Sequence, residues 1–167
     1  MTLDNKGMKN FISAIMFGVL TLALFKCCSL ALDYKNLRIG INATDSLNGY
    51  IALTDLAAKP KLDDIVLFEA PENKFTSKGV PFMKIIVGVE GDTIMVKGDE
   101  LYVGGKFRGI VKKFSNNGVD LFPIEDQVIP ENMFFMWTPH PDSYDSRYKS
   151  IGLINEDSIF GVSQFIF

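Results

Sequence analysis

The chain has 167 residues, a formal net charge of −3 and 22% charged residues. This balance lacks the clustered basic surface that nucleic-acid binding requires, so we expect no nucleic-acid partner. The two cysteines, Cys27 and Cys28, are adjacent, and His140 is the single histidine. A disulfide scaffold and a zinc site in the C-terminal part are therefore excluded, and we expect no metal and no cofactor.

An uncharged apolar run near the N-terminus predicts a transmembrane segment. The run from Phe11 to Phe25 reads FISAIMFGVLTLALF, and as a helix it rises about 22 Å, short of a bilayer core of about 30 Å. Continued through Leu32, the helix reaches about 33 Å, which is enough to span a membrane. We predict a signal-anchor over residues 11–32, in contact with membrane lipid, after a cytoplasmic tail over residues 1–10.

Two other interpretations of this run stay open. In the first, Lys6 and Lys9 form the basic region of a cleaved signal peptide that ends at Ser29-Leu30-Ala31. In the second, the run is a buried core helix. Basic residues lie on both sides of the run, so they indicate its orientation only weakly.

From about residue 33 onward the pattern becomes that of short strands. Runs rich in Val, Ile, Phe and Tyr alternate with Gly, Asn, Asp and Pro. The two-residue connections Gly98-Asp99 and Gly104-Gly105 are typical of tight hairpins. We predict one mainly β domain of curled antiparallel sheets over residues 33–167. The predicted strands are Ile51–Leu53, Asp64–Glu69, Met83–Val89, Thr93–Lys97, Glu100–Val103, Lys106–Lys113, Asn132–Trp137 and Ser158–Phe167.

Lys84 is the one charge in the run GVPFMKIIVGV. In a strand, Phe82, Lys84 and Ile86 share one face, and both faces of this strand are apolar. We therefore expect Lys84 to be buried or to line an apolar cleft. Burial lowers the pKa of a lysine and allows the neutral amine to act as a general base near pH 7. The alternative is an edge-strand lysine that reaches water or pairs with a carboxylate.

The loop between Ile41 and Tyr50 offers a nucleophile. It is rich in turn residues, and Ser46 within it would be exposed among backbone amides that can form an oxyanion hole. The alternative for this loop is an ordinary Asx or Ser turn.

A third segment follows the strand that ends at Trp137. It reads SYDSRY over residues 143–148. Asp145 and Arg147 are spaced for a local ion pair, and the Ser146 hydroxyl is available to orient a neutral lysine. The alternative is a solvated turn whose exposed ion pair contributes little to stability.

These segments, taken in chain order, resemble the membrane-bound signal peptidases. The resemblance is carried by Ser46 shortly after an N-terminal anchor, by the run KIIVGVEGDTI that starts at Lys84, and by the Asp-Ser-Arg-Tyr loop. It is closest to the TraF-like conjugative transfer signal peptidases and covers nearly the whole chain. The resemblance implies curled antiparallel sheets of the signal-peptidase type with one N-terminal transmembrane helix.

The resemblance also implies roles for individual residues. Ser46 matches the nucleophile and Lys84 the general base. Ser146 matches the position that helps to hold the lysine amine, and Asp145 and Arg147 match a pair that shapes the site. Gly91-Asp92-Thr93 matches a structural turn.

The sequence departs from the family pattern at four places. The proline that usually follows the nucleophile is missing from Ser46-Leu47-Asn48-Gly49. Ile85 replaces the basic residue that often follows the lysine, and Glu90 replaces the proline before Gly-Asp. The glycine after the Asp-Ser-Arg-Tyr loop comes late, at Gly152.

The activity implied is that of a serine endopeptidase that cleaves an exported precursor through an acyl-enzyme. Kinship suggests a conjugative pilin precursor as the substrate and other conjugation-system proteins as partners. Water resolves the acyl-enzyme in most relatives, whereas in some an amine of the substrate does so and gives a cyclic product. The expected location is the bacterial inner membrane, with a single span and the catalytic domain on the periplasmic side.

Three alternatives remain at this stage. A serine–histidine–aspartate triad would use Ser46, His140 and Asp145. A non-enzymatic assembly factor of a pilus or secretion complex would keep the anchor and the β domain without catalysis. A general type I signal peptidase would keep the chemistry with broader specificity.

Overall fold

The computed structural model describes residues 5–42, 44 and 46–167. Residues 1–4 of the expected tail, and positions 43 and 45 of the expected nucleophile loop, lie outside the described residues. The chain divides into two compact units between Arg38 and Ile39.

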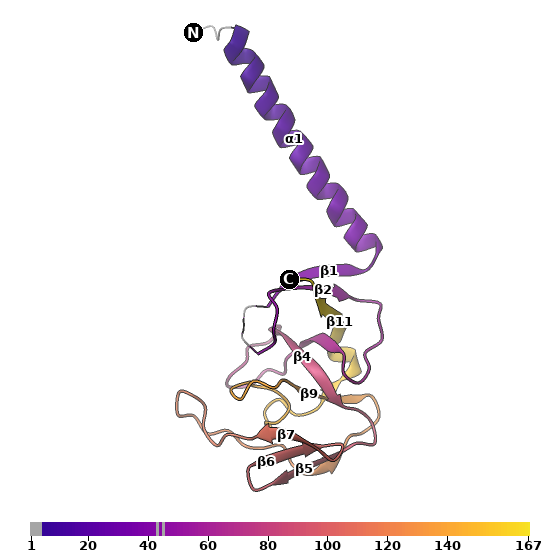
Figure 1. The fold of residues 1–167 in the computed structure, drawn as a ribbon, viewed down its shortest axis with the longest axis vertical. Helices are drawn as coiled ribbons and strands as arrows, with labels where there is room; N and C mark the ends of the chain where they lie inside the picture. The colour runs from indigo at the N-terminus through magenta and orange to yellow at the C-terminus, as the bar shows by residue number, and fades with distance from the viewer. Residues whose placement is uncertain (1–4, 43, 45) are drawn as a thin grey trace. The chain divides into compact units, whose positions relative to one another are not determined.

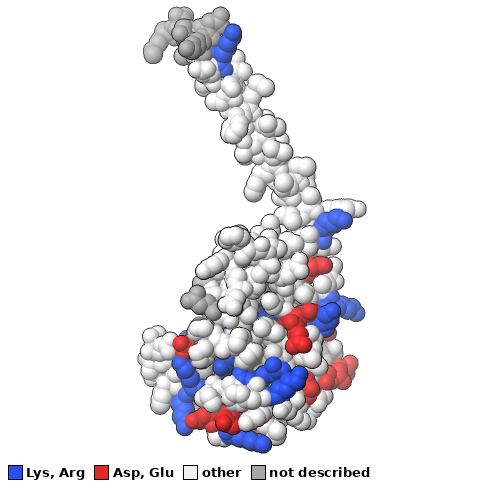
Figure 2. All heavy atoms as spheres, viewed as in Figure 1, with Lys and Arg blue, Asp and Glu red and all other residues white. Residues whose placement is uncertain are grey.

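The first unit is the helix α1 (Asn5–Tyr34), which has 30 residues and is therefore about 45 Å long. No proline interrupts this stretch, and Asn36 at a φ of 53° follows its end. Within the span Gly7–Tyr34, an 18-residue window has a mean hydropathy of 2.1, and none of that window is buried in protein. Figure 2 shows no charged sphere along the middle of the helix on the face in view. By length and composition, α1 is therefore able to cross a membrane, and it extends beyond the predicted span at both ends.

The second unit contains a seven-stranded sheet in the order β1-β2-β11-β3-β4-β9-β10 (Figure 1). The neighbouring strands from β2 to β10 pair antiparallel. Strand β4 is central to the site, because it lies between β3 and β9. The strands are β1 (Leu37–Ile41), β2 (Ile51–Asp55), β3 (Ile65–Glu69), β4 (Pro81–Gly88), β9 (Met133–Trp137), β10 (Ile154–Asn155) and β11 (Ile159–Phe165).

A four-stranded sheet, β7-β6-β5-β8, packs on the end of β4 and β9. Val87 and Phe135 from the large sheet share one core cluster with Ile94 and Leu101 from the small one. The glycine at position 88 permits this close packing, because a Cβ there would lie 2.6 Å from the Cγ1 of Val103. The strand register of β4 with β9 also shifts between Ile86 and Gly88. The strands are β5 (Thr93–Lys97), β6 (Glu100–Val103), β7 (Lys106–Ile110) and β8 (Gln127–Val128).

The prediction of a mainly β domain with antiparallel sheets is confirmed, and each of the eight predicted strands has a counterpart. Gly98-Asp99 and Gly104-Gly105 connect hairpins, as the register pairs Lys97 with Glu100 and Val103 with Lys106 show. Three further strands were not predicted. Strands β8 and β10 have two residues each, which is too short for an alternating pattern, and most of β1 is exposed. The strand predicted as Lys106–Lys113 ends at Ile110.

Candidate active site

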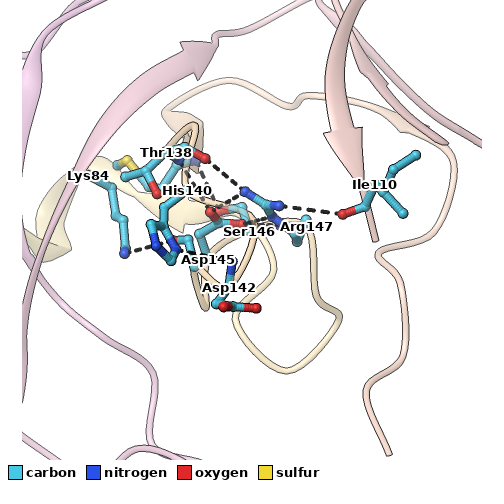
Figure 3. A network of polar contacts seen from close by, with 10 residues as sticks. Lys84, Ile110, Thr138, His140, Asp142, Asp145, Ser146 and Arg147 are labelled. Atoms are coloured by element: carbon cyan, nitrogen blue, oxygen red, sulfur yellow. Dashed lines mark hydrogen bonds and ion pairs between the residues drawn. The ribbon is translucent and has the colours of Figure 1, made fainter. Parts of the chain in front are cut away.

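Lys84 lies within β4, where it faces Val66 of β3 in the strand register. Its side chain is 6% exposed, and its Nζ donates a hydrogen bond of 2.9 Å to the Oγ of Ser143. Figure 3 shows the side chain extending toward the loop that follows β9. The uncharged run around Lys84 therefore buries it, as expected, and its amine meets a neutral hydroxyl rather than a carboxylate.

This environment lowers the pKa of Lys84 to about 8. Loss of water around the ammonium is the largest cause, and the positive charge of Arg147 lowers the pKa further. The carboxylate of Asp145 acts in the opposite direction and raises it. The Phe82 ring centre lies 5.6 Å from Nζ. Lys84 is therefore able to hold or release a proton near neutral pH.

Asp145 and Arg147 form a buried ion pair behind the lysine (Figure 3). Arg147 Nε and one terminal nitrogen donate to the two carboxylate oxygens at 2.7 and 2.9 Å. The same nitrogen donates to the carbonyl of Thr138 at 2.8 Å, and the Thr138 amide donates to Asp145 at 3.3 Å. The pair thus fixes the loop after β9 to the end of that strand. A solvated surface turn does not describe this segment.

The structure assigns the contact with the lysine amine to Ser143 rather than to Ser146. Ser146 is fully buried, and its Oγ accepts a hydrogen bond of 3.0 Å from the amide of Met136. Its own amide donates to the carbonyl of Met136. Ser146 therefore holds the loop against β9. The sequence-based prediction gave this contact to Ser146 and assigned no role to Ser143, because a loop has no fixed side-chain period that would distinguish the two serines.

Ser46, the expected nucleophile, lies in the loop before β2. Its Oγ is 2.8 Å from the Oγ1 of Thr44, and Thr44 Oγ1 donates to the Oδ1 of Asn42 at 3.1 Å. Because Thr44 has one hydroxyl proton and gives it to Asn42, Ser46 is the donor in its bond with Thr44. The Nδ2 of Asn42 also donates to the carbonyls of Leu47 and Gly49. Asn42 thus organises the loop that lacks the family's proline, a role sequence reasoning did not assign.

A hollow of about 470 Å³ opens beside Ser46. Leu47, Ile65 and Ile85 line it, and Ile85 directly follows Lys84 on β4. Ser46 therefore lies beside the strand that carries the lysine. Among the described residues, however, no hydrogen bond joins Ser46 to Lys84, since their partners are Thr44 and Ser143. Catalytic hydrogen bonds are often long or absent in a free enzyme and form with substrate.

His140 also lines the hollow beside Ser46. Its Nδ1 accepts a hydrogen bond of 3.1 Å from the amide of Asp142, whereas a triad needs Nδ1–H to donate to a carboxylate. Both carboxylate oxygens of Asp145 are bonded to Arg147. The geometry therefore disfavours a triad of Ser46, His140 and Asp145. Over residues 5–42, 44 and 46–167, no cluster of three His, Cys, Asp or Glu side chains is placed to hold a metal ion.

Comparisons with known proteins show which family this chain resembles. The family model described as "Signal peptidase, peptidase S26" matches residues 8–167. Signal peptidase I of Bacillus licheniformis is 33% identical over 118 residues, which cover 64% of this chain and 59% of the relative. Signal peptidase I T of Bacillus subtilis (strain 168) is 34% identical over 118 residues, covering 64% and 56%. The chain thus spans under two thirds of the length of these relatives.

A solved structure is also similar to part of the chain. It is a crystal structure of a signal peptidase I from Enterococcus faecalis V583, with 26% sequence identity and a TM-score of 0.40. The match covers 63% of this chain and 97% of that chain.

Proposed function

Because the chain belongs to the signal peptidase family S26, we propose that it is a membrane-anchored serine endopeptidase that cleaves exported precursor proteins. The observation that carries this proposal is the buried amine of Lys84, whose pKa is lowered to about 8 and whose hydrogen-bond partner is uncharged. A lysine in such a setting suits a general base. Ser46, beside the same strand, is the proposed nucleophile.

The proposed reaction is acyl transfer. Neutral Lys84 takes the hydroxyl proton of Ser46, and the serine oxygen forms a bond to the scissile carbonyl carbon. The Lys84 ammonium then gives that proton to the leaving nitrogen as the carbon–nitrogen bond breaks. Water attacks the resulting ester with Lys84 again as base, which releases the acyl segment and restores Ser46. Backbone amides near Ser46 would stabilise the oxyanion.

Ser46 and Lys84 form a catalytic dyad only if the loop that carries Ser46 rearranges slightly. In the free protein the Ser46 proton points to Thr44, and the Lys84 amine is held by Ser143. A substrate in the hollow beside Ser46 would press on the loop from the side of Ile65 and Ile85. We propose that substrate binding redirects the hydroxyl from Thr44 to Lys84.

The relatives favour a broad class of precursor over a narrow one. Those compared above are named signal peptidase I, which supports a general type I activity for this chain. Cleavage of a conjugative pilin precursor, with partners from a conjugation system, remains a narrower form of the proposal, as does release of a cyclic product. The apolar helix α1 supports membrane anchoring. We propose a single span with the β domain on the outer, periplasmic side, where exported precursors emerge.

Co-expression with precursor proteins tests the proposal. Wild type, Ser46→Ala and Lys84→Ala are compared by the mass of the precursor, using a general exported precursor and a conjugative pilin precursor. Ser77→Ala and Lys97→Ala, at exposed positions, are the matched controls. We expect processing by wild type and both controls and none by the two site variants. Processing by Ser46→Ala or Lys84→Ala would overturn the dyad, and no processing by wild type would favour the assembly factor.

His140→Ala separates the dyad from the triad in the same assay. His140 lines the hollow, so we expect a loss below about tenfold. A triad would lose about a thousandfold or more.

A further inference from the structure

His140 carries a hydrogen-bond donor that the protein itself does not use. Its Nδ1 accepts a hydrogen bond of 3.1 Å from the amide of Asp142. A neutral imidazole has one N–H group, and the nitrogen that accepts cannot carry it, so the proton lies on Nε2. Among the described residues Nε2 has no hydrogen-bond partner, and it is not one of the buried atoms that lack one. This N–H group is therefore accessible to a ligand.

The hollow that His140 shares with Ser46 has mainly apolar walls. Its volume of about 470 Å³ falls within the range of about 300–1,000 Å³ that is usual for ligand pockets. In pockets with such walls, a small number of polar groups fix the orientation of the ligand and provide specificity. The apolar residues that line this hollow are Leu47, Ile65, Ile85, Pro139 and Phe165.

The unused N–H group of His140 determines which side chains suit the hollow. A wholly apolar side chain would cover this group and separate it from water without giving it an acceptor, which opposes binding. A small side chain with one oxygen, such as that of threonine, would contact the apolar walls and accept the hydrogen bond. Asn48 is the other polar residue in the lining besides Ser46, but it is exposed, so its amide stays hydrated.

We propose that His140 determines specificity by donating from Nε2 to a side-chain oxygen of the precursor, on one of the three residues before the cut. The inference rests on the proposed function. In the acyl-enzyme the residues before the cut are joined to the oxygen of Ser46, and Ser46 itself lines the hollow. The residue recognised there is small and carries an oxygen acceptor, and threonine fits this description best.

Peptides that differ by one isosteric side chain test this inference, because Thr and Val have nearly the same shape and differ by the hydroxyl. Three pairs place either Thr or Val at the first, second or third position before the cut, and kcat/KM is measured for each peptide with the full chain in detergent micelles. At one of these positions we expect wild type to favour Thr by about fivefold, since one hydrogen bond between neutral groups changes a binding constant by about two- to tenfold.

Two variants of His140 and one control complete the test. We expect His140→Ala to lose activity only on the Thr peptide, which brings the ratio to about one. His140→Gln keeps an N–H donor, so we expect it to restore a ratio of about three or more. Gln127→Ala is the matched control, because Gln127 is exposed on β8 and does not line the hollow. We expect this variant to keep the wild-type ratio.

The outcomes separate the inference from the proposed function. A wild-type ratio near one at every position would overturn the inference and leave the proposed function intact. The inference would also fail if the ratio persisted in His140→Ala, if His140→Gln did not restore it, or if Gln127→Ala lost it as well. Cleavage that persists in Ser46→Ala, or no cleavage by wild type, would overturn the proposed function itself.

Discussion

Lys84 is the residue on which the proposed chemistry depends, because its amine can act as a base only when uncharged. With a pKa lowered to about 8, about a tenth of the amine is neutral at pH 7. We expect kcat/KM to rise about tenfold per pH unit below pH 7 and to level off above pH 9. The measurement is a pH–rate profile with a peptide substrate. A profile that is flat between pH 6 and pH 9 would contradict a lysine base.

The lowered pKa of Lys84 also makes the stability of the fold depend on pH. The unfolded lysine has a pKa of 10.5, so between about pH 8 and pH 10.5 the unfolded chain binds more protons than the folded chain at this position. The contribution of Lys84 to stability therefore rises with pH in this window. The cost of burying the ammonium is fully present below pH 8.

Ser143 and Ser146 have different partners, and their alanine variants should differ accordingly. Ser143→Ala removes the partner of the Lys84 amine, so we expect kcat to fall by about ten- to a hundredfold, with recovery in Ser143→Thr. Ser146→Ala leaves the buried amide of Met136 without its side-chain acceptor, which costs about 1–3 kcal/mol of stability. Steady-state kinetics and urea unfolding together check the contrast. A large kcat loss in Ser146→Ala with unchanged stability would reverse the assignment.

At the scale of elements, the loop after β9 is fastened to the sheet by one buried ion pair. Replacing Asp145 by Asn leaves the Arg147 guanidinium buried without its counter-charge. Breaking such a pair from one side typically costs about 3–5 kcal/mol, and we expect the free energy of unfolding to fall by that amount. Fluorescence of the single Trp137, which lies against Arg147, reports the transition. A loss below about 1 kcal/mol would show that the pair does not fasten the loop.

Strand β11 approaches β2 so closely that only glycine fits at one position. A Cβ at Gly161 would lie 2.3 Å from the backbone oxygen of Asp55, which cannot move as a side chain can. We expect Gly161→Ala to destabilise the β domain by about 1–3 kcal/mol. Gly40→Ala is the control, because a Cβ there meets nothing within 4 Å. Equal unfolding midpoints for the two variants in urea would contradict the close approach.

The elements that the sequence could predict are those with a local signal. The turn sequences Gly98-Asp99 and Gly104-Gly105 and the alternating apolar runs sufficed to predict β5 and β6, and the uncharged run around Lys84 sufficed to predict its burial. The choice of Ser143 over Ser146 could not be predicted, because it depends on how the loop folds back onto β9. The hydrogen bonds that Asn42 makes across the Ser46 loop could not be predicted either, because asparagine is common in many kinds of turn.

The whole molecule combines an apolar helix with a β domain that buries the amine of Lys84 and lowers its pKa. The apolar run from Phe11 predicted a membrane span over residues 11–32, and the helix that contains it, Asn5–Tyr34, continues beyond both ends of that span. Family membership then supports a role for both parts in precursor cleavage. The departures at Asn48 and Ile85 concern the loop and the hollow beside Ser46, where substrate preference would be determined.

Trapping of the acyl intermediate is the most direct test that Lys84 activates Ser46. The full chain is mixed with a peptide substrate, quenched in acid within milliseconds to seconds, digested and measured by mass spectrometry, with Lys84→Met as the comparison. We predict that wild type carries the acyl segment as an ester on the fragment that contains Ser46, and that Lys84→Met carries none. An adduct on another residue, or one that forms as fast in Lys84→Met as in wild type, would contradict the account.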